Sequence, residues 1–177
     1  MDMQLSGKKA LITGSTYGIG YAIAEALVKE GADVIITGRH QESVDTAIGK
    51  LKRINSKTKP TGISADCATI VGCQKVFDAE PEVDILINNL GIYERKTFFE
   101  IEDSDWTHFF EVNVMSGVRF ARFYIPKMVT KEWGRVIFVS SESGLMIPPE
   151  MIHYGFSKSA QLSISRGLAM SLSGTGV

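Results

Sequence analysis

The sequence lacks the features of a membrane, secreted or metal-binding protein. No apolar run among its 177 residues approaches the length of about 20 residues that a membrane-spanning helix needs. The first nine residues have no apolar core of the kind found in signal peptides. The two cysteines, Cys67 and Cys73, have neither CxxC spacing nor an adjacent histidine, so we expect free thiols and no metal site. These absences predict a cytoplasmic protein in a reducing compartment.

Neither sign of charge is in excess. The net charge is −1, with 44% hydrophobic and 22% charged residues, which is typical of soluble globular proteins. This balance gives no reason to expect nucleic acid or an anionic membrane as a partner. The length suits one domain with a sizeable core, and no repeat, low-complexity tract or linker divides it. We therefore expect a single domain over residues 1–177.

Apolar runs of strand length alternate with helical patterns along the chain. The run at 33–37 is β-branched and apolar on both faces, which is the mark of a strand inside a parallel sheet. The alternation predicts a doubly wound α/β fold, Rossmann-like, with strand order 3-2-1-4-5. The expected strands are 9–13, 33–37, 61–65, 83–87 and 135–140, and the expected helices are 18–31, 41–53, 69–79, 104–130 and 153–172.

The C-terminal end of the chain does not match a complete fold of this kind. Dinucleotide-binding folds of this class use six strands, whereas this sequence stops after the fifth expected strand and its helix. Residues 173–177 have the composition of a loop that enters another strand. We therefore expect the domain to be incomplete at its C-terminus, with the usual C-terminal strands absent.

A glycine-rich segment, residues 13–20, joins the first expected strand to the first helix. Gly14 permits a tight turn, Gly18 lets backbone amides approach a pyrophosphate, and Gly20 lets helix and strand pack closely. The helix N-terminus adds the positive end of a dipole. A glycine-rich turn without a ligand is the alternative, but the position between strand and helix favours a nucleotide site.

Tyr154 and Lys158 lie four residues apart on the last expected helix, and Ser141 precedes Tyr154 by thirteen positions. A phenol has a reference pKa of about 10 and is by itself a poor acid–base catalyst at neutral pH. An ammonium one helical turn away favours the phenolate, and a nearby hydroxyl can hold the reacting oxygen. The trio suits proton exchange with an alcohol or carbonyl oxygen. The spacing alone is also common in solvated surface pairs.

The chain resembles the short-chain dehydrogenase/reductase family. The resemblance rests on the TGxxxGxG loop at 13–20, the segment Asn88-Asn89-Leu90-Gly91 after the fourth strand, and the Ser141, Tyr154 and Lys158 set. It covers nearly the whole chain from about Leu5. Relative to the family, the chain looks truncated at its C-terminus. Extended relatives that epimerise nucleotide sugars have a tighter glycine spacing and fit less well.

The resemblance implies four catalytic residues: Asn113, Ser141, Tyr154 and Lys158. In such enzymes the Tyr is the general acid or base, and the Ser holds the substrate oxygen. The Lys favours the phenolate and binds the nicotinamide ribose, and the Asn, at a helix kink, positions a water in a proton relay. Ser140 and Ser143 are rivals for the Ser role, and the thirteen-residue spacing selects Ser141.

The end of the second expected strand favours NADP(H) over NAD(H). An acidic residue there would select NAD, and the sequence has Gly38 and Arg39 instead. Arg39 can pair with a 2′-phosphate, although it also suits a plain surface cation. Asp66 resembles the family's adenine-contacting Asp, with a helix N-cap as its alternative. The expected cofactor-binding residues are Gly14, Ser15, Tyr17, Gly18, Ile19, Gly20, Arg39, Asp66, Asn89, Gly91, Tyr154 and Lys158.

The sequence thus predicts an NADP(H)-preferring oxidoreductase that acts on a small carbonyl compound or secondary alcohol. The alternative is a non-catalytic dinucleotide-binding or interaction module, because the C-terminal segment that seats nicotinamide and substrate in the family is missing.

Relatives pair through the helices equivalent to 104–130 and 153–172, so a homodimer or homotetramer is expected. His153 is expected at the surface or lining the pocket, and Asn88 to bind backbone. The candidate pocket residues are mostly apolar: Ile92, Tyr93, Met146, Ile147, Met151 and Ile152.

Overall fold

The computed structural model describes residues 3–177 and contains one parallel sheet of five strands. The strand order is β3-β2-β1-β4-β5, which confirms the order expected from the sequence. All four neighbouring pairs run parallel, so every strand ends at the same edge of the sheet. The strands are β1 (Lys9–Ile12), β2 (Asp33–Gly38), β3 (Thr61–Ser64), β4 (Ile85–Asn88) and β5 (Arg135–Phe138).

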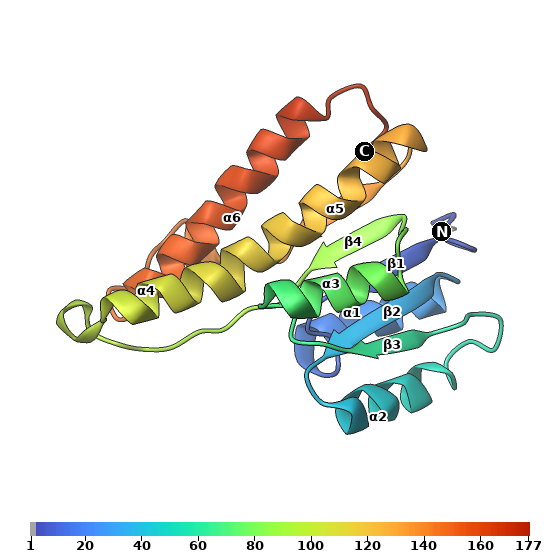
Figure 1. Cartoon of the computed structure of the whole chain (residues 1–177), viewed down its shortest axis with the longest axis horizontal. Coiled ribbons are helices and arrows are strands. Elements are labelled where there is room, and N and C mark those ends of the chain that lie inside the picture. The colour runs from blue at the N-terminus through green and yellow to red at the C-terminus, as the bar shows by residue number, and fades with distance from the viewer. Residues whose placement is uncertain (1–2) are drawn as a thin grey trace.

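Helices cover both faces of the sheet (Figure 1). On one face, α1 and α2 pack against the side chains of Ala10, Ile12 and Ile36. On the other face, α3 and α5 pack against Leu11 and Leu86. Alternate residues of the central strands thus enter two separate cores, which is why these strands are apolar throughout. The helices are α1 (Gly18–Lys29), α2 (Gln41–Leu51), α3 (Ile70–Ala79), α4 (Asp103–Phe109), α5 (Ser116–Thr130) and α6 (Ile152–Ser171).

The expected helix 104–130 is interrupted by a π-helical turn. This turn, η2 (Phe110–Met115), joins α4 to α5 and widens the backbone hydrogen-bond pattern around Asn113. Residues 3–177 also contain two short 3₁₀ turns: η1 (Phe98–Glu100) precedes α4, and η3 (Glu142–Gly144) precedes α6. The first turns of α6 lie beside α4 and η2, and this part of the molecule extends beyond the sheet (Figure 1).

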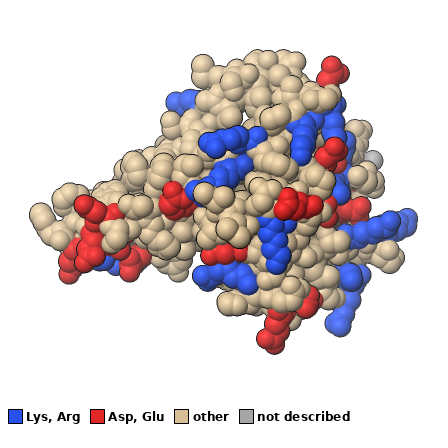
Figure 2. Space-filling model, viewed as in Figure 1, with Lys and Arg blue, Asp and Glu red and all other residues tan. Residues whose placement is uncertain are grey.

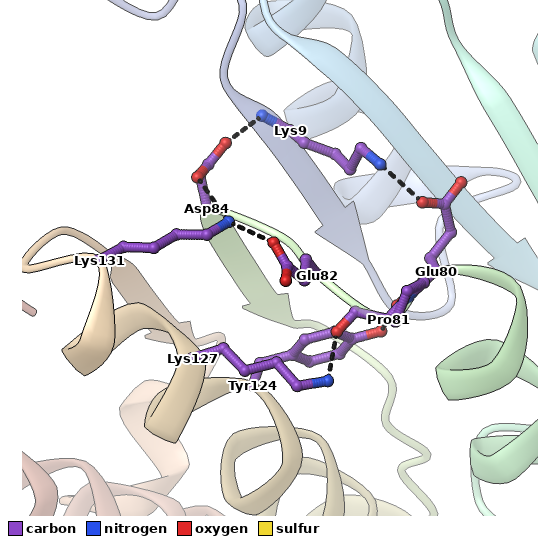
Figure 3. A network of polar contacts seen from close by, with 8 residues as sticks. All are labelled: Lys9, Glu80, Pro81, Glu82, Asp84, Tyr124, Lys127 and Lys131. Carbon is purple, nitrogen blue, oxygen red and sulfur yellow. Dashed lines mark hydrogen bonds and ion pairs between the residues drawn. The ribbon is translucent and has the colours of Figure 1, made fainter.

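An ion-pair and hydrogen-bond network fixes the opposite, amino-terminal edge of the sheet (Figure 3). The Lys9 ammonium pairs with the Glu80 carboxylate at 2.9 Å, and the Lys9 backbone N–H donates to Asp84 at 2.9 Å. The buried Tyr124 hydroxyl of α5 donates to the Glu80 carbonyl at 2.7 Å. Lys131 pairs with Glu82 at 2.9 Å. These contacts hold the loop between α3 and β4 against β1 and α5.

Acidic side chains gather at the projecting end of the molecule (Figure 2). That end carries η1, the loop after it and the start of α4, where Glu100, Glu102, Asp103 and Asp105 follow closely in sequence. Asp103 and Asp105 lie in the first turn of α4, where carboxylates stabilise the positive end of the helix dipole. Among residues 3–177 no helix is long and apolar enough to cross a membrane.

Candidate active site

A cleft of about 560 Å³ opens at the edge where the parallel strands end. It lies outside the carboxyl ends of β1, β2, β3 and β4, where α/β sheets of this kind bind their ligands. Ser15, Tyr154 and Lys158 are not among its lining residues. Nine of the expected cofactor-binding residues line it: Gly14, Tyr17, Gly18, Ile19, Gly20, Arg39, Asp66, Asn89 and Gly91.

The glycine loop forms one wall of the cleft, and its backbone conformation leaves no room for side chains at Gly20 and favours glycine at two further positions. Gly14 and Gly18 both have a φ of +61°, a left-handed conformation that favours glycine. A Cβ on Gly20 would lie 2.5 Å from the Asn89 amide nitrogen and 2.7 Å from the Gly14 carbonyl oxygen. The first turn of α1 therefore comes directly against the loop, and its residues Gly18, Ile19 and Gly20 line the cleft. The N–H groups of a helix's first turn have no partner within the helix and can bind an anion.

Hydrogen bonds to Asn89 and to residues of β1 and β2 hold this loop in place. The Asn89 side-chain amide donates to the Thr13 and Gly14 carbonyls, both at 2.9 Å. The fully buried Ser15 hydroxyl donates to the Ile12 carbonyl at 2.6 Å and accepts from the Thr37 N–H at 3.1 Å. The expectation that Asn88 binds backbone was wrong: its amide N and O have no partner among residues 3–177.

Two charged residues stand at the far rim of the cleft. Arg39 directly follows β2 and is exposed, and no carboxylate of residues 3–177 pairs with it. Asp66 follows β3, and one of its carboxylate oxygens accepts from the Ala68 N–H at 3.1 Å. The N-cap of α3 is Thr69, which accepts from the Gly72 N–H at 3.0 Å. The cap that the sequence offered as the alternative for Asp66 is therefore supplied by Thr69.

Tyr154 and Lys158 lie together on α6. The Lys158 ammonium is 5.7 Å from the centre of the Tyr154 ring. It donates to the Val139 carbonyl at 2.9 Å and to the Gln161 side-chain oxygen at 3.1 Å. Lys158 is only 5% exposed, and this burial lowers its pKa to about 8. A fraction of Lys158 is consequently a neutral amine near neutral pH.

Gly91 connects the cleft to this pair. A Cβ on Gly91 would lie 3.5 Å from the Lys158 ammonium nitrogen and 3.4 Å from the Asn113 side-chain oxygen. Because Gly91 also lines the cleft, the Lys158 amine lies just behind the cleft wall. The glycine loop and the Tyr154–Lys158 pair, far apart in the sequence, thus belong to one region.

Asn113 lies in the π-helical turn and is buried. Its side-chain oxygen accepts from the Ile92 N–H at 2.7 Å, and its amide donates to the Ile92 carbonyl and the Ser157 hydroxyl, both at 2.9 Å. This double contact with Ile92 fixes the segment that carries Gly91. The Asn113 backbone carbonyl accepts a hydrogen bond from the Gln161 amide.

Ser141 is the N-cap of η3, and its hydroxyl oxygen accepts from the Ser143 N–H at 3.1 Å. The next residues of η3 pack on α6, because a Cβ on Gly144 would lie 3.0 Å from the Lys158 backbone carbon. The rival Ser140 donates its hydroxyl hydrogen to the Lys158 carbonyl at 3.1 Å, so its hydroxyl is held against the helix backbone.

Two residues of this region have surroundings that the sequence did not reveal. Gln161 contacts both Lys158 and Asn113, and the only signal for it was its position three residues after Lys158 on one helix face. The expectation that His153 lies at the surface or in the pocket was wrong, because its side chain is fully buried against Phe109. Among residues 3–177 no group of three His, Cys, Asp or Glu side chains forms a metal site.

Comparisons with known proteins identify the family of this chain. The family model for short chain dehydrogenase matches residues 8–177. An oxidoreductase of Bacillus subtilis, described as uncharacterized and named YvaG, is 51% identical over the whole chain, which covers 67% of it. The 3-oxoacyl-acyl-carrier-protein reductase FabG of Escherichia coli is 33% identical, with 99% of this chain and 71% of FabG covered.

Solved structures give the same result. The crystal structure of L-sorbose reductase from Gluconobacter frateurii, complexed with NADPH and L-sorbose, matches with a TM-score of 0.93 at 33% identity. The match covers 99% of this chain and 68% of the reductase chain. The chain therefore spans about two thirds of the length of the relatives it matches. Since the family model accounts for nearly all of its residues, the chain belongs to the short-chain dehydrogenase family of oxidoreductases.

Proposed function

We propose that the protein is an NADP(H)-dependent oxidoreductase that interconverts a carbonyl compound and a secondary alcohol, with Tyr154 as general acid and base. One observation carries this proposal: Gly91 lines the cleft and also lies against the Lys158 amine. A dinucleotide in the cleft and a proton donor on α6 can therefore act on the same substrate.

The residues of the cleft fit a dinucleotide. The left-handed Gly18 and the close contact at Gly20 keep side chains away from the backbone N–H groups at the start of α1, whereas the Gly14 and Ser15 N–H groups donate to Thr37. Gly18, Ile19 and Gly20 would hold the pyrophosphate, Asp66 the adenine side, and Gly91 with Lys158 the nicotinamide ribose. When bound, the nicotinamide would supply or accept the hydride.

Tyr154, Lys158 and Ser141 would manage the proton. In the reducing direction, the Tyr154 hydroxyl donates its proton to the carbonyl oxygen as this becomes an alcohol. The Lys158 ammonium, 5.7 Å from the ring centre, stabilises the phenolate that remains. The Ser141 hydroxyl donates to the substrate oxygen and keeps it within reach of Tyr154. In the oxidising direction the same phenolate accepts the alcohol proton.

The preference for NADP(H) rests on Arg39. Its guanidinium is free of carboxylates in the described chain and stands at the rim where the adenosine ribose would lie. The residue before Arg39 is Gly38, which has no carboxylate that would repel a 2′-phosphate. A Cβ at this position would lie 2.5 Å from the Thr16 methyl carbon, so Thr16 would have to move for a larger residue. The L-sorbose reductase matched above was crystallised with NADPH.

The substrate side is apolar. Tyr93, whose ring centre lies 6.4 Å from that of Tyr154, is 78% exposed, and the nearby segment after η3 exposes Leu145, Met146 and Ile147. Such a lining favours a partly apolar carbonyl compound, and Met side chains adapt to several shapes.

The proposal includes a homodimer or homotetramer that forms through α4, α5 and α6. The alternative of a non-catalytic module has less support, because the matched relatives are named as oxidoreductases and reductases.

The test is the Tyr154→Phe variant, assayed by NADPH oxidation with a panel of carbonyl compounds. Loss of the phenolic proton should reduce kcat by at least about 100-fold, in line with the usual contribution of a general acid. Tyr21→Phe, a half-buried tyrosine of α1 outside the cleft, serves as the matched control and should keep wild-type turnover.

Two results would contradict the proposal. Wild-type turnover in Tyr154→Phe would remove the assigned acid. A wild-type protein that binds NADPH but oxidises it with no member of the panel would favour the non-catalytic alternative. Fluorescence titration of NADPH with both variants separates a binding defect from a catalytic one.

A further inference from the structure

Gln161 occupies a buried position between two residues of the candidate active site. It lies on α6 close to one turn after Lys158, and only 2% of it is exposed. Its side-chain oxygen accepts from the Lys158 ammonium at 3.1 Å, and its amide nitrogen donates to the Asn113 carbonyl. The side chain therefore bridges α6 and the π-helical turn.

The partners of Gln161 fix the direction of its amide. An ammonium can only donate, and a backbone carbonyl can only accept. If the amide were reversed, its NH₂ group would face the Lys158 ammonium and its oxygen would face the Asn113 carbonyl, so both of these hydrogen bonds would be lost and both ends of the buried amide would be unpaired. The acceptor end therefore remains directed at Lys158.

This contact controls where the Lys158 ammonium can point. Two of its three N–H groups are taken by the Val139 carbonyl and the Gln161 oxygen. Among residues 3–177 the third has no hydrogen-bond partner, and both Gly91 and the Tyr154 ring lie near the ammonium. Without the Gln161 acceptor, the buried Lys158 ammonium would keep only the Val139 carbonyl as a hydrogen-bond partner, and its flexible four-carbon chain could adopt other orientations.

We propose that Gln161 is a positioning residue for Lys158, which holds the ammonium in its charged form and directs its remaining N–H toward Tyr154. The inference rests on the proposed oxidoreductase function, because it assigns Gln161 a part in supporting the Tyr154 phenolate. A merely structural Gln161 would tie α6 to the π-helical turn and leave the titration of Lys158 unchanged.

The experiment measures the titration of Lys158 by NMR in protein with ¹³C-labelled lysine. The Lys158 signal is assigned by its loss in Lys158→Arg. Gln161→Met keeps the length of the side chain and removes the acceptor, so the Lys158 midpoint should fall by about one to two pH units, because the charged form loses a hydrogen bond that favours it. Gln161→Glu places a carboxylate beside the ammonium, so the midpoint should rise.

Gln74→Met is the matched control, because Gln74 is an exposed glutamine of α3 that pairs with Asp78 away from Lys158. It should leave the midpoint at the wild-type value. An unchanged midpoint in a folded Gln161→Met variant overturns the proposal. If Gln161→Met does not fold, Gln161→Glu decides, and an unchanged or lowered midpoint in it overturns the proposal equally.

A second measurement links the shift to the reaction. The limb of the pH profile of kcat/KM that follows deprotonation of Lys158 should move in the same direction as the Lys158 midpoint in each Gln161 variant, while Gln74→Met keeps the wild-type profile. The NMR titration needs neither cofactor nor substrate. A protein that reduces no carbonyl compound would therefore sink the proposed function, whereas the Lys158 midpoints would still decide the role of Gln161.

Discussion

Arg39 carries a full positive charge at the rim of the cleft, and no carboxylate in the described part of the chain compensates it. Its backbone contributes to the fold, since its carbonyl accepts from the Ser64 hydroxyl at 3.1 Å. The guanidinium itself makes no ion pair among residues 3–177. A change of the side chain should therefore affect the ligand more than the fold.

We predict that Arg39→Asp reverses the proposed preference for NADP(H) over NAD(H). A charge-assisted contact with a 2′-phosphate contributes roughly 1.5 to 3 kcal/mol, so kcat/KM with NADPH should fall by about 10- to 100-fold. NADH should gain, because a carboxylate at this place accepts hydrogen bonds from a ribose 2′-hydroxyl. Arg53→Asp, at an exposed position just after α2, is the control. An unchanged ratio of the two coenzymes would show that Arg39 is a plain surface cation.

At the scale of single elements, the π-helical turn is the feature that the residue pattern did not show, although the family resemblance implied a kink at Asn113. The residues from 104 to 130 are apolar on nearly all sides, and this pattern predicts a buried helix without indicating its hydrogen-bond register. The structure places the wider turn at Phe110–Met115, where the Asn113 side chain binds Ile92 and its carbonyl accepts from Gln161. These partners are 21 and 48 positions away in sequence, so no local pattern could reveal them.

The contact between α1 and the glycine loop gives a prediction for one element. In Gly20→Ala the new methyl group would meet the Asn89 amide and the Gly14 carbonyl, both too close for a carbon atom, so α1 must move away from the loop. We expect the Kd for NADPH to rise by about 10-fold or more. A loss of about 1.4 kcal/mol of binding free energy, from backbone N–H groups that no longer meet the ligand, is enough for that change. Equilibrium titration of NADPH fluorescence measures it.

Gly49→Ala supplies the control for this prediction. Gly49 lies in α2, and a Cβ there would meet nothing within 4 Å. Alanine should stabilise the exposed helix by about 0.5 to 1 kcal/mol and leave the Kd for NADPH unchanged. Wild-type NADPH binding by Gly20→Ala would show that the loop tolerates the displacement.

At the scale of the whole molecule, His153 couples folding to pH. The ring is fully buried, with its centre 4.1 Å from that of Phe109, and neither ring nitrogen has a hydrogen-bond partner among residues 3–177. Burial is the main cause that lowers the pKa of His153; the carboxylates of Glu94 and Asp105 oppose this effect, and Lys96 adds to it. The folded protein therefore holds His153 neutral at a pH where the unfolded chain already binds a proton.

The sign of the effect follows from this difference. Above the unfolded pKa of about 6.5 both states carry a neutral imidazole, so His153 has no pH-dependent influence there. As the pH falls below that value, the unfolded state gains a proton first and the folded state loses stability. In His153→Leu, the decrease in Tm between pH 7 and pH 5 should be smaller than in the wild type. His108→Leu, an exposed histidine of α4, should keep the wild-type decrease, and equal decreases in all three proteins would contradict the prediction.

The sequence was sufficient for features that depend on local pattern. The five strands and their order followed from short β-branched runs such as 33–37 and from the alternation with helices. The site could be assembled as motifs, because the glycine loop and the Tyr154–Lys158 spacing each lie within eight residues. What remained hidden depends on contacts between distant segments. His153 is buried against Phe109 of α4, the Asn88 amide has no hydrogen-bond partner among residues 3–177, and Gln161 joins α6 to the π-helical turn.

The parallel direction of all five strands separates two tasks in space. The edge with the strand ends carries the cleft, and the opposite edge carries the Lys9, Glu80 and Asp84 contacts of Figure 3. Substitutions that raise the stability of the protein can therefore be placed among the charged residues at the start of β1 and β4, away from the residues that line the cleft. Conversely, substitutions that alter ligand specificity can be placed in the loops at the edge that carries the cleft, where they leave the contacts of Figure 3 unchanged.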